Sequence, residues 1–189
     1  MSTNYLASTP EVGGTGIQNN GREILLRAGF NKVRISPPVG APLAGFAARE
    51  GVSVGVHDDL YSRALVLGNE EVALALVCVD VLALPSEFIK RVRTAIHDST
   101  GIKPRSIMIA STHTHAGPVT ITTFFNPDES VDQDYLNLLA ASITESVVTA
   151  WRDRFPARVG VGTGRVKGVG VNRRSADPTK LNTVFAIDC

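Results

Sequence analysis

The chain has 189 residues, of which 43% are hydrophobic and 20% are charged, as is typical of one soluble globular domain with its own core. Its formal net charge is +1 and its Lys and Arg residues form no dense cluster, which argues against binding to nucleic acid or to an acidic membrane. No apolar stretch is long enough to span a bilayer, because Asp80 interrupts the best candidate.

The first 22 residues are polar and rich in Gly, Ser, Thr and Asn, and they lack the basic start and apolar centre of a signal peptide. We expect residues 1–22 to be a flexible lead-in and residues 23–189 to be the folded part of the chain. This pattern favours a cytoplasmic location, with secretion as the alternative if the N-terminus is incomplete.

Ordered structure is expected to begin with a strand. Residues 28–36 alternate apolar and polar side chains, and Pro37 and Pro38 then end the ladder because proline lacks an N–H to donate. Residues 37–59 contain several Gly and Pro residues and predict a long loop. In a compact domain such a loop is more often functional than idle.

Two apolar runs follow, SRALVLG (62–68) and EVALALVCVDVLAL (71–84). The dipeptide Gly68-Asn69 between them is a strong hairpin signal. The second run is apolar at consecutive positions, which predicts a strand buried on both faces. Cys78, within that run, is interpreted as a small buried hydrophobic residue.

Helical periodicity predicts a helix over residues 86–100, with Ser86 as its N-cap and Gly101 just past its end. Residues 106–112 predict another short buried strand, and residues 134–151 a second helix. The inner face of that second helix is expected to consist of Tyr135, Leu138, Leu139, Ser142, Ile143, Val147 and Trp151.

The remaining chain, from residue 157 onward, is interpreted as two or three further strands. Strands that alternate with two amphipathic helices predict an α/β protein with a mixed β-sheet and two main helices packed on it. There is no internal repeat and no sign of a second domain.

His113 and His115 are two of only four histidines, and they follow the predicted strand 106–112 at once. On an extended backbone, residues two apart point to the same side, so both imidazoles would face one way and would suit a divalent metal such as zinc. The alternative is a pair of solvated histidines beside a turn, because Gly117-Pro118 comes next. The spacing alone does not decide between these interpretations.

His57 is the obvious source of a further ligand, since it lies at the end of the predicted loop. Asp58 and Asp59 follow it and could bind a metal or orient an imidazole. The alternative is an ordinary turn, because the residues of His-Asp-Asp are also common in turns. His97 is expected in the last turn of a helix, where a partly charged imidazole interacts favourably with the helix dipole. No catalytic or metal-binding role is assigned to it.

Asp80 is a carboxylate within an apolar run, where an unpaired charge is costly. We expect it to take part in the site, as a ligand or as an acceptor for a histidine N–H. The alternative is an ion pair with Arg63, or a hydrogen bond from a nearby backbone N–H.

Three segments together resemble the N-terminal part of the neutral/alkaline (non-lysosomal) ceramidase family. They are AGFNKVRISPPVGAPLAGFAAR (28–49), GVHDDLYSRALVL (55–67) and MIASTHTHAGP (108–118), and VNRR near residue 171 fits the same pattern. The resemblance implies a zinc-dependent amidase that cleaves the N-acyl bond of ceramide-like lipids.

The same resemblance implies that His57 and His115 are zinc ligands and that His113 assists the reaction. Family members are longer, and their later portion supplies a glutamate and a tyrosine that complete the zinc shell. Asp80 or Asp59 would orient an imidazole.

The expected function is therefore a zinc-dependent amide hydrolase of sphingolipid metabolism, present here as an incomplete catalytic domain that is inactive by itself. One alternative is a non-catalytic fragment that serves as a binding or assembly module. Another is a metal-dependent hydrolase of some other amide or ester.

Overall fold

The computed structural model describes residues 18–19, 22–23, 26–69, 71–122 and 130–160. The chain divides into two compact units, Met1–Pro156 and Ala157–Cys189, and each is considered by itself. Every helix and strand described below belongs to the first unit. The strands predicted after residue 157 lie outside the described residues, apart from 157–160, which form no strand.

Five strands form the main sheet, in the order β6-β5-β4-β3-β7. They are β3 (Arg27–Arg34), β4 (Tyr61–Gly68), β5 (Ala73–Val79), β6 (Ile107–Ser111) and the two-residue β7 (Phe155–Pro156). Only β5 and β6 pair in parallel, and a helix connects them; the other neighbours are antiparallel. The predicted α/β class with a mixed sheet is confirmed.

The hairpin between β4 and β5 forms at the predicted position. The amide of Asn69 donates to the carbonyl of Val72 (2.8 Å), and the side-chain oxygen of Asn69 accepts from the amides of Glu71 (2.9 Å) and Val72 (2.8 Å). An asparagine side chain that bonds the backbone two residues on is a common way to close a turn. The hairpin predicted from Gly68-Asn69 is therefore confirmed.

Helix α1 (Ser86–Thr100) is followed by a short 3-10 helix, η1 (Pro104–Ser106). Gly101 ends α1 as predicted, in the left-handed conformation (φ 75°), with its amide donating to the carbonyl of His97. The prediction that Ser86 caps the start was wrong. Pro85 occupies the N-cap position and makes no side-chain capping hydrogen bond.

Helix α2 (Gln133–Arg152) begins at Asp132, whose side chain accepts hydrogen bonds from the amides of Asp134 and Tyr135. Most of its predicted inner face is buried, but Leu138 is 52% exposed and Leu136 is buried in its place. A helix that packs on a sheet buries a stripe about two residues wide per turn, and here Leu136 falls inside that stripe.

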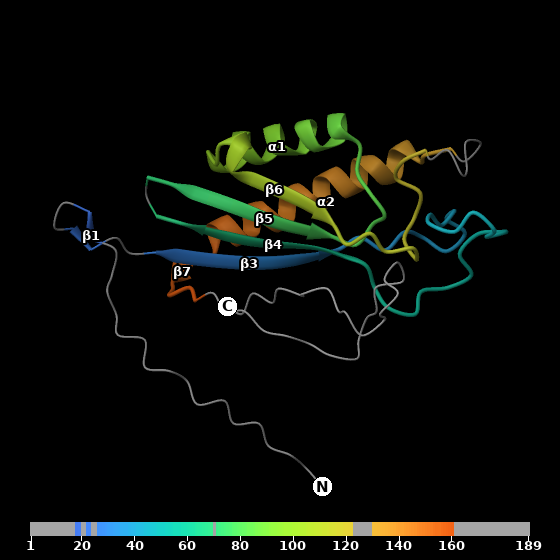
Figure 1. Cartoon of the computed structure of the whole chain (residues 1–189), viewed down its shortest axis with the longest axis horizontal. Helices are drawn as coiled ribbons and strands as arrows, with labels where there is room; N and C mark the ends of the chain where they lie inside the picture. The colour runs from blue at the N-terminus through green and yellow to red at the C-terminus, as the bar shows by residue number, and fades with distance from the viewer. Residues whose placement is uncertain (1–17, 20–21, 24–25, 70, 123–129, 161–189) are drawn as a thin grey trace, which may run out of the picture. The chain divides into compact units, whose positions relative to one another are not determined.

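Both helices cover the same face of the sheet (Figure 1). The main core lies between them and the sheet, with contributions such as Val66, Val77, Val92 and Ile143. The opposite face, called here the open face, is exposed in the part of the chain that the structure describes. Its exposed hydrophobic residues are Phe30, Leu74, Leu76, Met108 and Phe155.

The open face corrects three predictions from the sequence. Strand β5 alternates buried and exposed residues instead of being buried on both faces, and Cys78 is exposed instead of buried. Likewise β6 buries Ile107 and exposes Met108. The two strands are apolar on both faces, but the described helices cover only one.

Residues at the end of the predicted flexible lead-in form a small hairpin, in which β1 (Gln18–Asn19) pairs with β2 (Arg22–Glu23). The other residues of that stretch lie outside the described residues. Neither α1 nor α2 is long and apolar enough to cross a membrane.

Candidate functional site

Two loops meet at the end of the sheet where β6 finishes. The amide of Ala44 donates to the carbonyl of Gly117 (2.9 Å), and the amide of Val119 donates to the carbonyl of Pro42 (3.1 Å). The long loop after β3 is thus joined to the loop after β6 by short antiparallel pairing. The histidine pair lies just before this junction in sequence.

His113 and His115 lie next to each other, with ring centroids 5.1 Å apart and ring planes at 69°. The predicted reason for their proximity was wrong, because β6 ends at Ser111 and the pair is not on an extended strand. His113 instead has a positive φ of 59°, while its amide donates to the carbonyl of Val81 (3.1 Å). A left-handed residue in the turn brings the two rings together.

The proton on the His113 ring can be placed from its partner. Its Nδ1 lies 2.9 Å from the carbonyl oxygen of Leu82. A carbonyl only accepts hydrogen bonds, so Nδ1 carries the hydrogen and Nε2 of the neutral ring keeps a lone pair. An imidazole oriented by a backbone carbonyl in this way is suited to bind a metal or to accept a proton.

His115 is half-buried and lies against the loop after β3. Its ring meets the Phe46 ring edge to face, with centroids 5.1 Å apart. Its backbone carbonyl accepts a hydrogen bond from Nη2 of Arg49 (2.8 Å), while Nη1 of the same guanidinium donates to the carbonyl of Ala44 (3.0 Å). The long predicted loop therefore contributes directly to the surroundings of the histidine pair.

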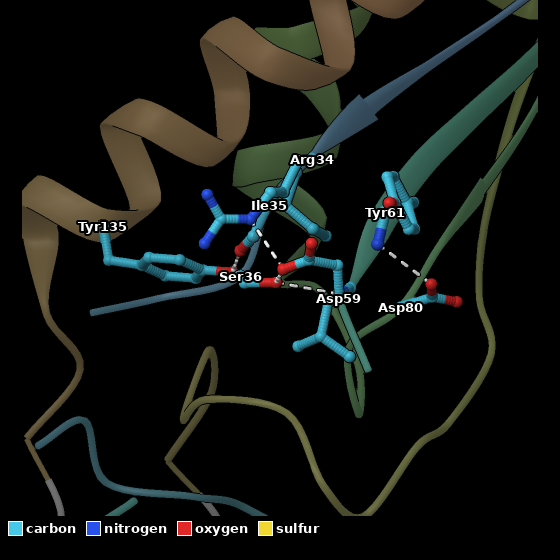
Figure 2. Close-up of polar contacts among 8 residues, drawn as sticks. Arg34, Ile35, Ser36, Asp59, Tyr61, Asp80 and Tyr135 are labelled. Carbon is cyan, nitrogen blue, oxygen red and sulfur yellow. Dashed lines mark hydrogen bonds and ion pairs between the residues drawn. The ribbon is translucent and has the colours of Figure 1, made fainter. Parts of the chain in front are cut away.

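The two candidate aspartates hold strand ends together (Figure 2). Asp59 accepts from Nε of Arg34 (2.6 Å) and from the hydroxyl of Ser36 (2.7 Å). The hydrogen bonds from Ser36 and Arg34 lower the pKa of the Asp59 carboxyl. Asp80 accepts from Nη1 of Arg63 (2.6 Å) and from the amide of Tyr61 (2.9 Å).

For Asp80, these contacts are the alternative stated from the sequence, an ion pair with Arg63 together with a backbone hydrogen bond. Within the described chain, neither Asp59 nor Asp80 forms a hydrogen bond with an imidazole. Their proposed catalytic roles stay predictions.

His57 lies on the surface, with 97% of its side chain exposed, and its Nδ1 is 2.8 Å from a carboxylate oxygen of Asp58. His97 has its Nδ1 3.1 Å from the carbonyl of Ile102, close to the end of α1, in keeping with a structural role. Among the described residues, no three His, Cys, Asp or Glu side chains lie close enough to hold one metal ion. The structure thus brings His113 and His115 together but does not add His57 to them.

The donor set of the pair still suits zinc. Imidazole nitrogens are ordinary zinc ligands, and the Leu82 carbonyl leaves Nε2 of His113 available. Two imidazoles are fewer than the three protein ligands of a usual catalytic zinc site. The described residues therefore fit part of a zinc site.

Comparison with known proteins decides the family. The family model described as "Neutral/alkaline non-lysosomal ceramidase, N-terminal" matches residues 28–181, which is most of the chain. The chain belongs to the neutral/alkaline non-lysosomal ceramidase family.

Solved ceramidases share the fold of this ceramidase-family chain. The neutral ceramidase from Pseudomonas aeruginosa superposes with a TM-score of 0.72 at 21% identity, over 80% of this chain and 25% of that one. A ceramidase complexed with C2 gives a TM-score of 0.69 at 23% identity, over 79% of this chain and 25% of the other. This chain spans about a quarter of the length of those ceramidases.

Three residues around the histidine pair of this ceramidase-family chain had no role assigned from the sequence: Gly45, Phe46 and Arg49. They lie at least 66 positions before His115, so no local pattern connects them to it. Arg49 follows a run of small residues in a glycine-rich loop, where an arginine is usually solvated. Only the folded arrangement shows that its guanidinium bonds the His115 carbonyl.

Proposed function

We propose that the chain is part of a zinc-dependent amide hydrolase of the neutral ceramidase type, which cleaves the N-acyl bond of ceramide-like lipids. The observation that carries this proposal is the adjacent pair His113 and His115, with the His113 ring oriented by the Leu82 carbonyl. Membership of the ceramidase family supports the choice of substrate class.

As the family resemblance implies, His57 and His115 would hold the metal, although the described residues do not bring His57 to the pair. A bound zinc ion would lower the pKa of its water to about 7 and polarise the amide carbonyl. His113, with its Nε2 lone pair, would accept a proton from the attacking water and return it to the leaving amine. Asp59 and Asp80 would contribute by fixing the strand ends next to these loops.

Zinc binding to the chain is expected to be weak, because the described residues offer fewer ligands than a closed zinc site needs. We therefore expect little or no turnover of ceramide by the 189-residue chain alone. Vigorous hydrolysis of a ceramide by the purified chain would contradict this expectation.

The test is zinc affinity, measured by competition with a chelating dye, for the parent and for single histidine variants. His57→Ala and His115→Ala should each weaken zinc binding about tenfold or more. His97→Ala is the matched control, since that ring lies on α1 and bonds the carbonyl of Ile102 just past the helix, and it should leave the affinity unchanged. A parent that binds no zinc while remaining folded would overturn the proposal.

A non-catalytic binding or assembly module is the second candidate, favoured by the exposed hydrophobic residues of the open face. A folded chain without zinc affinity would support this candidate. A chain that binds zinc and cleaves a simple amide or ester, but no ceramide, would instead support a hydrolase of another substrate.

A further inference from the structure

Residues 44–49, called here the seat segment, lie against His115 although they precede it by more than 65 positions. The segment begins where Ala44 pairs with Gly117 and ends at Arg49. Three separate contacts connect it to His115, at the backbone carbonyl, at the imidazole ring and at the base of the side chain. Each involves a different residue of the segment.

Arg49 provides the first contact. Its two terminal nitrogens donate to carbonyls on two different loops, Nη2 to His115 (2.8 Å) and Nη1 to Ala44 (3.0 Å). Because the guanidinium is planar and rigid, these two bonds fix the two carbonyls relative to each other. The guanidinium also lies over the Phe46 ring, 4.9 Å from its centroid, so its own position is restrained.

Gly45 provides the second contact and Phe46 the third. Gly45 has a φ of +108°, which L side chains rarely adopt, and a Cβ at this position would lie 2.4 Å from Cγ of His115. The backbone of the seat segment therefore occupies the space directly beside the imidazole. Phe46 closes another side of it with an edge-to-face contact.

We propose that Arg49 and Gly45 are positioning residues for His115, holding its backbone and its ring in place so that the imidazole can act as a ligand. That Arg49 and Gly45 hold His115 in place is argued from the contacts alone. That this placement raises the affinity for zinc rests on the proposed function, and the two claims are tested by separate measurements.

The first measurement is the two-dimensional ¹H–¹³C spectrum of the full chain with ¹³C-labelled histidine, at one fixed pH. The chain has four histidines, so four ring Cε1–H signals are expected, and the single His→Ala variants assign them. Arg49→Met keeps the long side chain but removes both hydrogen bonds. It should shift the His115 signal and, through the ring contact, the His113 signal, while the signals of His57 and His97 stay in place.

Arg91→Met is the matched control for this substitution. Arg91 is also an arginine over an aromatic ring, at 5.5 Å from the Phe88 centroid, but it lies on α1 and donates to the side chain of Asn137 on α2. It should leave the His115 signal unmoved. Arg49→Lys should shift that signal less than Arg49→Met does, since an ammonium can replace one of the two bonds.

The second substitution is Gly45→Ala, with Gly51→Ala as its control. Both glycines have positive φ (+108° and +81°), but a Cβ on Gly51 meets nothing within 4 Å. The strain of the backbone is thus common to both, and only Gly45→Ala should displace His115. If Gly45→Ala fails to fold, Arg49→Met still decides the question.

The outcomes separate the two proposals. If the His115 signal moves no further in Arg49→Met than in Arg91→Met, the positioning role is wrong, whatever the zinc affinity. If the signal moves and zinc affinity falls about tenfold, both proposals are supported. If the signal moves but the parent binds no zinc, the positioning role stands and the proposed function fails.

Discussion

Asp59 connects the end of β3 to the start of β4, because its carboxylate accepts hydrogen bonds from both Arg34 and Ser36. The Ser36 hydroxyl in turn accepts a hydrogen bond from the amide of Leu60 (2.9 Å). This small network fixes the point at which the loop of residues 37–59 returns to the sheet. It gives Asp59 a structural role that can be measured.

We expect Asp59→Asn to lower the free energy of unfolding at neutral pH, because a neutral amide accepts these hydrogen bonds less strongly than a carboxylate. The folded-state pKa of Asp59 is lowered, so its stabilising contribution is complete above the unfolded-state pKa and is lost as the pH falls through the folded-state pKa. Urea unfolding of parent and variant in progressively more acidic buffers should show the two stabilities converge.

Asp58→Asn is the control, since that neighbouring carboxylate is 89% exposed and bonds the 97% exposed side chain of His57. It should change the free energy of unfolding little at any pH. A difference for Asp59→Asn that persists unchanged into acid would refute the proposed charge effect.

At the scale of single residues, the sequence predicted some neighbouring side chains but not how the backbone brings them together. His113 and His115 do lie together, but this depends on the positive φ of His113, which no pattern in the sequence predicts. The ion pair of Asp80 with Arg63 could be foreseen as an alternative because Arg63 lies on β4 and Asp80 directly follows the neighbouring strand β5. The contact of Arg49 with His115 could not, since it depends on how two distant loops fold together.

The two helices differ in how they begin. Asp132 bonds the first turn of α2 through its side chain, at 2.9 Å to the amide of Asp134 and 3.1 Å to that of Tyr135. Helix α1 starts after Pro85 without such a bond. The predicted helix ranges were nearly right because hydrophobic periodicity and Gly101 mark them, whereas the cap of α1 was misassigned because Ser86 is already inside the helix.

Asp132→Ala should therefore lower the free energy of unfolding by about 1 kcal/mol, since it removes both capping bonds. Ser86→Ala, at the start of α1, is the comparison and should be close to neutral, because Ser86 is exposed and makes no capping bond. Urea denaturation of both variants measures the two effects. Equal losses would mean that the Asp132 bonds contribute little to stability.

Taken whole, the first unit is a sheet with helices on one side. The sequence predicted its α/β class and most of its elements, because alternation, helical period and turn residues act locally. It could not predict the open face, since an apolar strand has the same composition whether or not another layer covers it. Which layers cover a sheet depends on the whole domain, and this chain spans about a quarter of the solved ceramidases.

Neighbouring residues of β6 should reveal this one-sided core. Ile107 is 1% exposed, so Ile107→Ala should cost about 3 kcal/mol, within the range for truncation of a buried side chain. Met108 is 58% exposed on the open face, so Met108→Ala should cost less than about 1 kcal/mol. The measurement is the urea midpoint of each variant, and similar losses at both positions would mean that the open face is covered in solution.

Cys78 lies on the open face, opposite Arg63 on β4 and Ala110 on β6, and is exposed. The thiol is therefore a natural reporter on that surface. With Cys189 replaced by serine, the rate at which an alkylating reagent modifies the native chain reads out the accessibility of the sheet directly. Any polypeptide or lipid that binds to the open face would slow the alkylation. The alkylation rate therefore shows directly whether the open face is covered, which stability measurements show only indirectly.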